Sequence, residues 1–340
     1  MAKPDWHPER LAARLPFLDR RAALVAATRA FFTGRGYREV ETPCLVPAPG
    51  AEVHIRAFGT RFEPHIGVGQ GRPLWLRTSP ELAIKKLLAG GAGPVFELAR
   101  VWRNGEVSAR HAPEFTMLEW YRPGLPFDGL MAETEDYVRA VCPPVVEHQG
   151  VRTDLALPFE RLTMQDAFAR HCNGLDLLGT EGDTGRLHAA AARAGFPPQA
   201  GESWEDLFFR LLLERVEPAI GRDRATFLTH WPAPQAALAR RDPADPRAAL
   251  RFELFAAGIE LANAFDELTD PAEQRLRFEE ANAERRRITG EQGWDVDADF
   301  IAALEAGLPP TAGIALGFDR LAMLASGAPR IEDVVWLPVT

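Results

Sequence analysis

The sequence predicts a mixed α/β (α+β) fold whose strands occur mainly as hairpins. Residues 95–124 place bulky side chains at strand spacing on both sides of a short charged loop. Residues 251–270 predict a second hairpin, with its turn near 256–258. Residues 20–34 carry one apolar stripe at helical spacing and end at glycine. These observations predict antiparallel strand pairs with helices between them.

The size and composition are those of a soluble globular protein. The 340 residues suffice for one large domain or two smaller ones. Apolar residues make up 46% of the chain and charged residues 26%. No apolar run approaches the roughly 20 residues that cross a bilayer, and no secretory signal is evident at the N-terminus. Three scattered cysteines form neither a zinc pattern nor a disulfide framework, so we expect a cytoplasmic protein without membrane contact.

The net charge of −9 bears on the partners that the protein can have. Proteins that wrap nucleic acid usually gather a basic surface, so the charge argues mildly against such a function. We expect no stable tRNA binding, and a basic protein partner fits the charge somewhat better.

The N-terminal third predicts one helix and two short strands. Residues 1–18 are rich in proline and charge and predict a loose extension ahead of the helix at 20–34. Alternation of apolar and polar residues predicts strands at 37–41 and 74–78.

A further helix follows the second of these strands. Ser79 is placed to cap it, and Pro80 suits its first turn. On the residues alone, Glu81 is a carboxylate that stabilises the helix N-terminus.

The middle of the chain predicts helices without catalytic residues. Residues 126–250 contain several helix candidates separated by proline and glycine; Thr163 caps one, and residues 204–216 carry an apolar stripe. The charged stretch 271–306 predicts a solvated helix. The residues expected only for packing or at the surface are Cys142, His171 and Cys172.

The hairpin at 95–124 carries charges that alternate with apolar residues. Arg103, Arg110 and His111 are donors, whereas Glu114 and Glu119 are acceptors. One face can therefore present charge into a cleft while the other face packs. A surface hairpin with solvated charges is the alternative.

The second hairpin contains a pair of carboxylates. A turn near 256–258 places Glu253 and Glu260 opposite each other. Facing carboxylates repel unless a cation or a proton lies between them. Mg²⁺ binds carboxylate and phosphate oxygens together, so the pair suits a nucleotide site. In the alternative, one of the two glutamates pairs with an arginine.

Four stretches resemble, in the right order, the motifs of class II aminoacyl-tRNA synthetases. GYREVETPCL at 36–45 resembles motif 1, and the stretch 103–124 resembles motif 2, with HAPEFTMLEWY similar to the lysyl branch. RFELFAAGIELANAFDELTD at 251–270 resembles the lysyl-type metal and amino-acid strands, and TAGIALGFDRLAML at 311–324 resembles motif 3, a strand that leads into a helix. The resemblance covers nearly the whole chain.

This resemblance implies a class II catalytic domain with an antiparallel sheet flanked by helices. It implies one domain over residues 1–340 and a homodimer formed through motif 1. Its implied segments are motif 1 near 20–50, motif 2 near 95–124, a helical insertion near 126–250, and metal and substrate strands with motif 3 near 251–328.

The resemblance further implies ATP as a substrate and Mg²⁺ as its metal. Adenylate formation crowds negative charge around phosphorus, and arginines suit this because their guanidinium grips phosphate bidentately. The implied catalytic residues are Arg103, at the α-phosphate, and Arg320, at the γ-phosphate. Phe115 would stack on adenine, and His111 would donate to the phosphates. Further implied nucleotide contacts are Asn104, Glu260, Leu261, Asn263 and Gly317, and the implied metal ligands are Glu253 and Glu260.

A lysine-like substrate carries two ammonium groups, each of which needs an acceptor in a partly buried site. The lysyl resemblance implies that Tyr121 and Glu267 receive the side-chain ammonium, whereas Glu81 and Glu119 face the other amino group. The other implied substrate contacts are Ser79, Pro80 and Ala315.

The chain is similar to the short paralogues of lysyl-tRNA synthetase that attach (R)-β-lysine to a lysine of elongation factor P. Motif 1 begins too early for the anticodon-binding domain that precedes it in the synthetases. Ala315 stands where the synthetases have glycine and the paralogues alanine. This methyl group favours an amino group moved by one carbon, a bias worth about 1–3 kcal/mol. The resemblance therefore implies elongation factor P as the acceptor.

Three positions depart from the family pattern. Gly105 stands where motif 2 has glutamate, with Glu106 one place later; Ala112 replaces an asparagine, and Ala264 replaces a glycine. Either the loop shifts so that Glu106 serves, or backbone groups replace it. Two other functions stay open: an α-lysine-activating enzyme that acylates tRNA or a small molecule, and a catalytically silent synthetase-like binding protein, which Gly105 favours.

Overall fold

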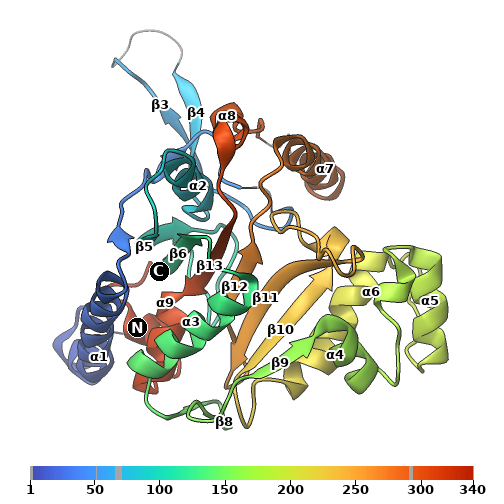
Figure 1. Cartoon of the computed structure of the whole chain (residues 1–340). Coiled ribbons are helices and arrows are strands. Elements are labelled where there is room, and N and C mark those ends of the chain that lie inside the picture. Colours follow the sequence, from blue (N-terminus) through green and yellow to red (C-terminus); the bar gives the residue numbers. More distant parts are fainter. Residues whose placement is uncertain (1–2, 51, 66–70, 291–293, 340) are drawn as a thin grey trace. The chain divides into compact units, whose positions relative to one another are not determined.

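A computed structural model describes residues 3–50, 52–65, 71–290 and 294–339 (Figure 1). Its contacts divide the chain into two compact parts, unit 1 (Met1–Pro126 with Glu267–Thr340) and unit 2 (Phe127–Asp266). Each unit combines helices with strands that are mostly antiparallel, which confirms the predicted fold class. The single domain over residues 1–340 stays a prediction.

The candidate site of unit 1 lies on three neighbouring strands. β5 (Val95–Trp102) and β6 (Glu114–Pro123) form the predicted antiparallel hairpin. β13 (Thr311–Gly317) pairs antiparallel with the other edge of β6. The short strand β1 (Arg38–Glu39) lies parallel to β5. Motif-like stretches that are far apart in sequence are thus adjacent in space.

Helix α1 (Pro8–Gly34) begins earlier than predicted. The expectation of a loose extension over residues 1–18 is wrong, because the buried side of the helix already includes Arg14 and Leu18. Pro8 fits the first turn, where no backbone N–H is needed.

The sheet of unit 1 packs its apolar face against α1. Phe32 of α1 stacks on Phe96 of β5, with ring centroids 5.1 Å apart, and contacts Trp120 of β6 at 5.0 Å. All three side chains are fully buried. The residues that alternate with them on β5 and β6 consequently lie on the opposite face.

The rest of unit 1 surrounds this sheet. A small sheet has the order β2 (Leu45–Val46), β4 (Arg72–Leu76), β3 (Gly59–Phe62). Where one charged helix was predicted, at 271–306, the structure has two helices, α7 (Pro271–Thr289) and α8 (Ala298–Gly307). Phe278 of α7 packs against Phe300 of α8, with ring centroids 5.8 Å apart. The remaining helices are α2 (Glu81–Ala89) and α9 (Phe318–Ser326).

Unit 2 has its own four neighbouring strands. β10 (Thr226–Pro232), β11 (Ala248–Ala256) and β12 (Ile259–Asp266) run antiparallel in that order, and β9 (Glu160–Thr163) lies parallel to β10. β7 (Val145–His148) and β8 (Val151–Asp154) form a separate hairpin. Residues 126–250 contain the predicted helices but also four of these strands, β7 to β10, which the sequence did not predict, and the role of this stretch as an insertion stays a prediction.

Helices cover the strands of unit 2. α4 (Met164–His171) begins at the predicted cap, where the Thr163 hydroxyl accepts from the Asp166 backbone at 3.0 Å. A capping box between Ser203 and Asp206 starts α6. The bounds of the helices not yet given are α3 (Phe127–Val141), α5 (Thr184–Arg193) and α6 (Trp204–Leu211).

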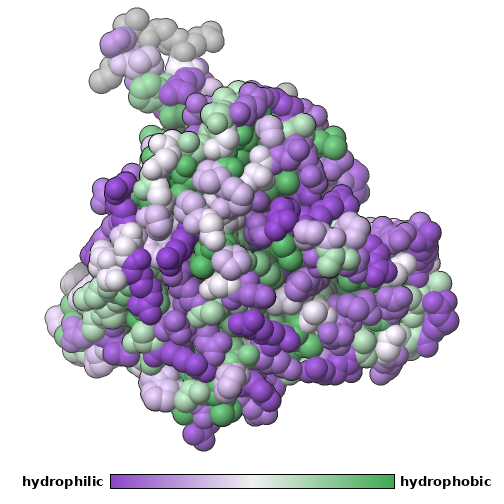
Figure 2. Space-filling model, viewed as in Figure 1, coloured by the Kyte–Doolittle hydropathy of each residue, from purple (hydrophilic) through white to green (hydrophobic). Residues whose placement is uncertain are grey.

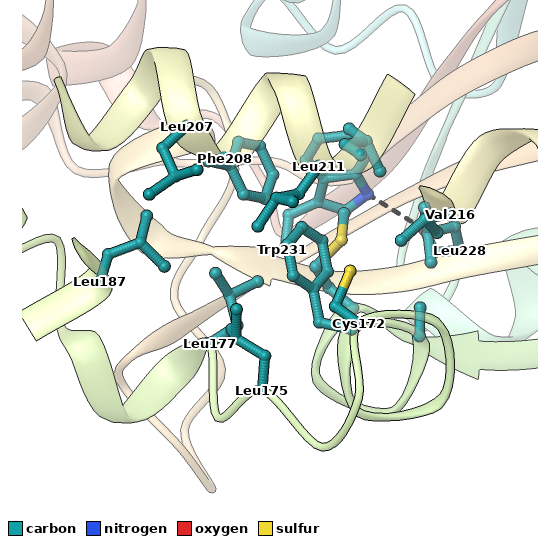
Figure 3. Close-up of a cluster of buried hydrophobic side chains, with 14 of the residues drawn as sticks. Cys172, Leu175, Leu177, Leu187, Leu207, Phe208, Leu211, Val216, Leu228 and Trp231 are labelled. Atoms are coloured by element: carbon teal, nitrogen blue, oxygen red, sulfur yellow. Dashed lines mark hydrogen bonds between the residues drawn. The ribbon is translucent and has the colours of Figure 1, made fainter. Parts of the chain in front are cut away.

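An aromatic cluster forms the core beneath these helices (Figure 3). Phe208 stacks on Trp204 at 5.1 Å and meets Trp231 edge-on at 6.0 Å. The indole of Trp231 donates to the Leu228 carbonyl at 3.1 Å, so its polar atom is satisfied. Cys172 is buried in the same cluster and serves packing, as predicted. This core anchors β10, next to the β11–β12 hairpin.

Hydrophilic residues predominate on the face visible in Figure 2. Among the described residues, no helix is both long and apolar enough to cross a membrane.

Candidate active site

One face of β6 and β13 carries the predicted substrate residues. Glu119 lies directly opposite Ala315, and Tyr121 lies opposite Gly313. These four residues share a face because strand residues two apart point the same way. The cross-strand pairing therefore puts the Ala315 methyl beside Glu119, a predicted ammonium acceptor.

Three buried carboxylates and one buried ammonium lie next to this face. We call Glu81, Glu119, Glu267 and Lys85 the acidic cluster. The Lys85 Nζ lies 2.5 Å from Glu81 Oε1 and 2.5 Å from Glu267 Oε2. No side chain of the cluster is more than about a tenth exposed. Glu81, which begins α2, is thus part of an ion-pair cluster as well as a residue of the first helical turn.

Glu119 is fixed by two hydroxyl groups. Ser79 Oγ donates to its Oε1 at 2.7 Å, and Tyr121 OH donates to its Oε2 at 2.8 Å. Burial, with the nearby charge of Glu81, raises the pKa of Glu119 from 4.5 to about 8. Burial and the charge of Glu119 likewise raise the pKa of Tyr121. Ionisation of Glu119 in this buried site is therefore unfavourable in free energy.

Glu267 has spare capacity to bind a cation. Burial, together with repulsion from Glu81 and Glu119, raises its pKa to about 8 although Lys85 acts in the opposite direction. Glu267 Oε2 receives the Lys85 ammonium, whereas Oε1 has no hydrogen-bond partner among the described residues. Oε1 can therefore still accept from a ligand.

Gly313 leaves room for Tyr121 and Glu267 to meet. A Cβ built on Gly313 would overlap both the Tyr121 ring and the Glu267 carboxylate. Glycine at this point of β13 thus lets the two residues implied for the side-chain ammonium lie side by side. The sequence patterns did not single out Gly313, although it precedes Ala315 by two residues on the same face.

A second buried carboxylate, Glu97, lies beside Glu119 on the next strand and is paired with an arginine. Glu97 of β5 lies directly opposite Glu119. Arg77 Nη2 pairs with Glu97 Oε1 at 2.8 Å, and Thr42 Oγ1 donates to Glu97 Oε2 at 2.8 Å. Glu97 is therefore already satisfied by a positive charge, whereas Glu119 is held by the hydroxyl donors of Ser79 and Tyr121.

The start of α2 differs slightly from the prediction. Pro80 occupies the N-cap position and makes no side-chain cap. Ser79 Oγ nevertheless accepts from the Glu81 backbone at 3.0 Å while it donates to Glu119. Ser79 thus links the helix start to the carboxylate.

Two arginines and a histidine of unit 1 are the implied phosphate contacts Arg103, Arg320 and His111. The Arg103 guanidinium lies over the Phe115 ring, 5.3 Å from its centroid, and its buried Nε has no partner among the described residues. Arg320 Nη2 lies 2.6 Å from His111 Nε2, and His111 Nδ1 lies 2.7 Å from Ser108 Oγ. Since arginine only donates, Nε2 accepts and the imidazole proton sits on Nδ1. Both ring nitrogens are engaged, so the predicted phosphate donor role of His111 requires the contact to rearrange and stays a prediction.

A carboxylate next to Arg320 ties three elements together. Asp319 Oδ2 accepts from the Thr116 backbone at 2.8 Å, and Asp319 Oδ1 accepts from Arg21 of α1 at 2.8 Å. Gly317, one of the implied nucleotide contacts, forms the N-cap of α9, two residues before Asp319. This network fixes where α9 begins and thereby the backbone that carries Arg320.

The loop between β5 and β6 explains the departure at Gly105. Gly105 has φ +84°, which favours glycine. Gly105 is exposed, whereas Glu106 is half-buried. The Asn104 backbone donates to the Arg56 carbonyl at 2.8 Å. Glu106 is thus less exposed than Gly105, and the choice between the shifted loop and backbone groups stays a prediction.

The β11–β12 hairpin of unit 2 has a different register from the one predicted. Its turn lies at Ala257–Gly258, close to the predicted place. However, Glu253 pairs with Asn263, and Glu260 pairs with Phe255, so the two glutamates are not opposite each other. The register shifts between Leu254 and Phe255, where β12 contributes Leu261 as an extra residue. A bulge of this kind leaves no clear signal in the sequence.

Glu253 forms the arginine pair that was the alternative. Arg251 Nη2 pairs with Glu253 Oε1 at 2.6 Å, and Arg251 Nε donates to Asn263 Oδ1 at 3.1 Å. Burial, followed by the charge of Glu260, still raises the pKa of Glu253 to about 8. The two carboxylates therefore interact despite the shifted register. Carboxylate oxygens suit Mg²⁺, which usually takes one or two carboxylates and completes its shell with water and phosphate.

Three or more metal-binding side chains do not gather at any one place in the described ranges. The metal site implied by the resemblance is the pair Glu253 and Glu260, and its role stays a prediction.

The sequence analysis did not identify Lys85, the one cation of the acidic cluster. In α2 the buried residues are Glu81, Ile84, Lys85 and Leu88. These positions form a single helical stripe, and a lysine on a buried stripe, one turn after a glutamate, was the available signal.

Comparison with known proteins gives one family and many relatives. The family described as "tRNA synthetases class II (D, K and N)" matches residues 11–340. An elongation factor P–(R)-β-lysine ligase of Klebsiella pneumoniae (strain 342) is 46% identical over 334 residues, which cover 97% of this chain and 96% of the relative. The protein of the same name from Salmonella paratyphi B is 44% identical with the same coverage.

Proposed function

The chain belongs to the class II tRNA synthetase family (D, K and N), and from this premise we propose that it is a ligase that joins (R)-β-lysine to elongation factor P. The amino acid is first activated by ATP as an adenylate and is then transferred to a lysine ε-amino group of the acceptor. The relatives that carry this name cover nearly the whole chain.

One observation carries the substrate assignment. The acidic cluster holds three buried carboxylates against one ammonium, so its full ionisation leaves an excess of two negative charges. An isolated buried charge is unfavourable unless it is paired. A substrate with two ammonium groups neutralises this excess, whereas an ordinary amino acid supplies only one.

We assign the substrate ammonium groups as the family resemblance implies. Tyr121 and Glu267 receive the side-chain ammonium, and Glu81 and Glu119 receive the other. The spare acceptor capacity of Glu267 supports this assignment. Ala315, opposite Glu119, favours (R)-β-lysine over α-lysine. Ser79 and Pro80 are the remaining proposed contacts of the amino acid.

The adenylation step requires positive charge and no protein nucleophile. A carboxylate oxygen of the amino acid attacks the α-phosphorus of ATP, the bond to the bridging oxygen breaks, and pyrophosphate leaves. We propose that Arg103 binds the α-phosphate and the substrate carboxylate, and that Arg320 binds the γ-phosphate end. The Nε of Arg103, which has no partner in the described part of the chain, supports its share of this role. Such preorganised donors stabilise developing charge.

The other nucleotide contacts are also proposals. Phe115 offers a ring for adenine, and the proposed contacts of the phosphates and ribose are Asn104, His111, Glu260, Leu261, Asn263 and Gly317. Glu253 and Glu260 would hold Mg²⁺, which neutralises phosphate charge when it is bound.

Transfer completes the reaction. The acceptor ε-amine attacks the acyl carbon of the adenylate, loses a proton and expels AMP, so that an amide forms. We further propose a homodimer, a cytoplasmic location and no stable tRNA binding. The charge of −9 supports the last point.

Mass spectrometry of the acceptor tests this proposal. Elongation factor P incubated with the protein, ATP and (R)-β-lysine should gain one β-lysyl group on a single lysine. The Arg103→Ala variant should give no modified acceptor, and tRNA should stay unacylated. Acylated tRNA with an unmodified acceptor would contradict the proposal and favour the α-lysine-activating alternative.

A further inference from the structure

Lys85 is a cation on the buried side of α2. Its side chain has no exposure to solvent. It lies on the buried stripe of α2, between the apolar residues Ile84 and Leu88. Its ion-pair partners there are Glu81, one helical turn earlier, and Glu267.

The neighbouring lysine shows the ordinary arrangement. Lys86 pairs with Asp297 and Asp299 at 2.8 Å and is 25% exposed. It links α2 to the start of α8 at the surface, as many lysines do. Lys85, by contrast, joins two carboxylates that the proposed function assigns to different ammonium groups of the substrate.

We propose that Lys85 is a positioning residue that sets amino-acid specificity by spacing Glu81 from Glu267 and by matching the charge of the acidic cluster to a diammonium substrate. This inference deepens the proposed function and rests on it. Lys85 itself does not touch the reacting carboxylate or phosphate.

The spacing argument follows from the geometry. Glu81 and Glu267 come from segments far apart in sequence, and each has an oxygen 2.5 Å from the same nitrogen. Neither carboxylate can move away without breaking an ion pair in a buried site. Lys85 therefore fixes the distance between the two acceptors. That distance distinguishes α-lysine from β-lysine, because the separation of their two amino groups differs by one carbon.

The charge argument follows from the surroundings. Tyr121 of β6 also faces the cluster, and Glu52 adds negative charge near Glu81. Glu97 is already paired with Arg77 and leaves the balance unchanged. Without the Lys85 ammonium, the cluster has three uncompensated carboxylates and must take up a proton. A proton on Glu81 or Glu267 removes an acceptor that the substrate needs.

Two variants separate these effects from a purely structural ion pair. Lys85→Met removes the charge and keeps an unbranched side chain, whereas Lys85→Arg keeps the charge and changes the spacing. Lys86→Met is the matched control, because it also breaks two ion pairs of α2, outside the cluster. Thermal unfolding of each variant reports any loss of fold. Pyrophosphate exchange reports KM and kcat for the substrates (R)-β-lysine, α-lysine and ATP.

For Lys85→Met we expect KM for (R)-β-lysine to rise on the order of a hundredfold, the size expected when a buried pair loses one partner. KM for ATP should change little, and the optimum of kcat/KM should move to higher pH. Lys85→Arg should keep the pH optimum but change the ratio of kcat/KM for β-lysine to that for α-lysine by roughly tenfold. Lys86→Met should match the wild type in both KM values, in the pH optimum and in the substrate ratio.

The inference is overturned if Lys85→Met folds and keeps the wild-type KM, pH optimum and substrate ratio. If Lys85→Met does not fold, Lys85→Arg decides, and an unchanged substrate ratio overturns the inference. Exchange by the wild type with neither lysine would instead contradict the proposed function. In that case calorimetric binding of (R)-β-lysine to the wild type and to Lys85→Arg still tests the spacing, and equal affinities overturn it.

Discussion

Replacement of Glu119 by glutamine should make the protein more stable and inactive at the same time. The Glu119 side chain is fully buried, and its hydrogen-bond partners are the hydroxyl groups of Ser79 and Tyr121. Glutamine keeps its shape, and both hydroxyls can accept as well as donate. The substitution therefore removes a buried negative charge without creating a cavity.

The size of the effect follows from the pKa of Glu119, which is raised from 4.5 to about 8. Such a rise corresponds to about 5 kcal/mol, at roughly 1.4 kcal/mol per pH unit. A carboxyl group with a raised pKa in the folded protein binds its proton more tightly there than in the unfolded chain. It therefore imposes no cost below pH 4.5, an increasing cost as pH rises to about 8, and a constant cost above that.

Urea unfolding measured across this pH range checks the prediction. In the absence of amino acid, Glu119→Gln and the wild type should be similar at pH 5. At pH 9 the variant should be more stable by about 2 to 5 kcal/mol, the upper value being reached only if Glu81 and Glu267 do not adjust. Saturating (R)-β-lysine should stabilise the wild type at pH 9 and leave the variant nearly unchanged.

Glu97→Gln is the matched control with the opposite sign. Glu97 is just as deeply buried and lies directly opposite Glu119, but it pairs with Arg77. Its replacement leaves a buried guanidinium unpaired and should cost about 3 to 5 kcal/mol at every pH. This reasoning would be refuted if Glu119→Gln were less stable than the wild type at pH 9. It would also be refuted if the difference in unfolding free energy between the two proteins were the same at every pH.

Three further substitutions test other parts of the account. Gly313→Ala should raise KM for the amino acid more than tenfold and leave KM for ATP unchanged, because its Cβ overlaps Tyr121 and Glu267; equal effects on both constants in pyrophosphate exchange would contradict this. Arg320→Lys keeps the charge but loses the planar fork, so kcat should fall by roughly 10- to 100-fold; a wild-type kcat would remove Arg320 from the phosphate site. Phe208→Ala opens the core of unit 2 and should lower the free energy of unfolding by about 3 to 5 kcal/mol, and a change below about 1 kcal/mol by urea titration would mean that the cluster in Figure 3 is loosely packed.

The shared face of the proposed substrate residues could be predicted because they lie on regular strands. The family resemblance singled out Glu119, Tyr121 and Ala315, and alternation along β6 and β13 places all three on one face. Helix α1 was predicted too short, because Pro16 and the charges before it conceal a continuous buried side.

What the sequence could not supply is the register and the partner of each charge. The bulge at Leu261 shifts β12 against β11, so Glu260 faces Phe255 and not Glu253. The pairing of Arg251 with Glu253 depends on that register. Lys85 was overlooked because lysine in a helix is usually solvated, and its partner Glu267 lies far away in the sequence.

The central claim is that this protein activates a diammonium amino acid, and amino-acid-dependent ATP–pyrophosphate exchange tests it most directly. The purified protein should exchange strongly with (R)-β-lysine, more weakly with α-lysine, and not at all without an amino acid. A preference for α-lysine would contradict the role given to Ala315 and favour a tRNA or small-molecule acceptor. Absence of exchange with both would contradict the enzyme assignment and favour a synthetase-like binding protein.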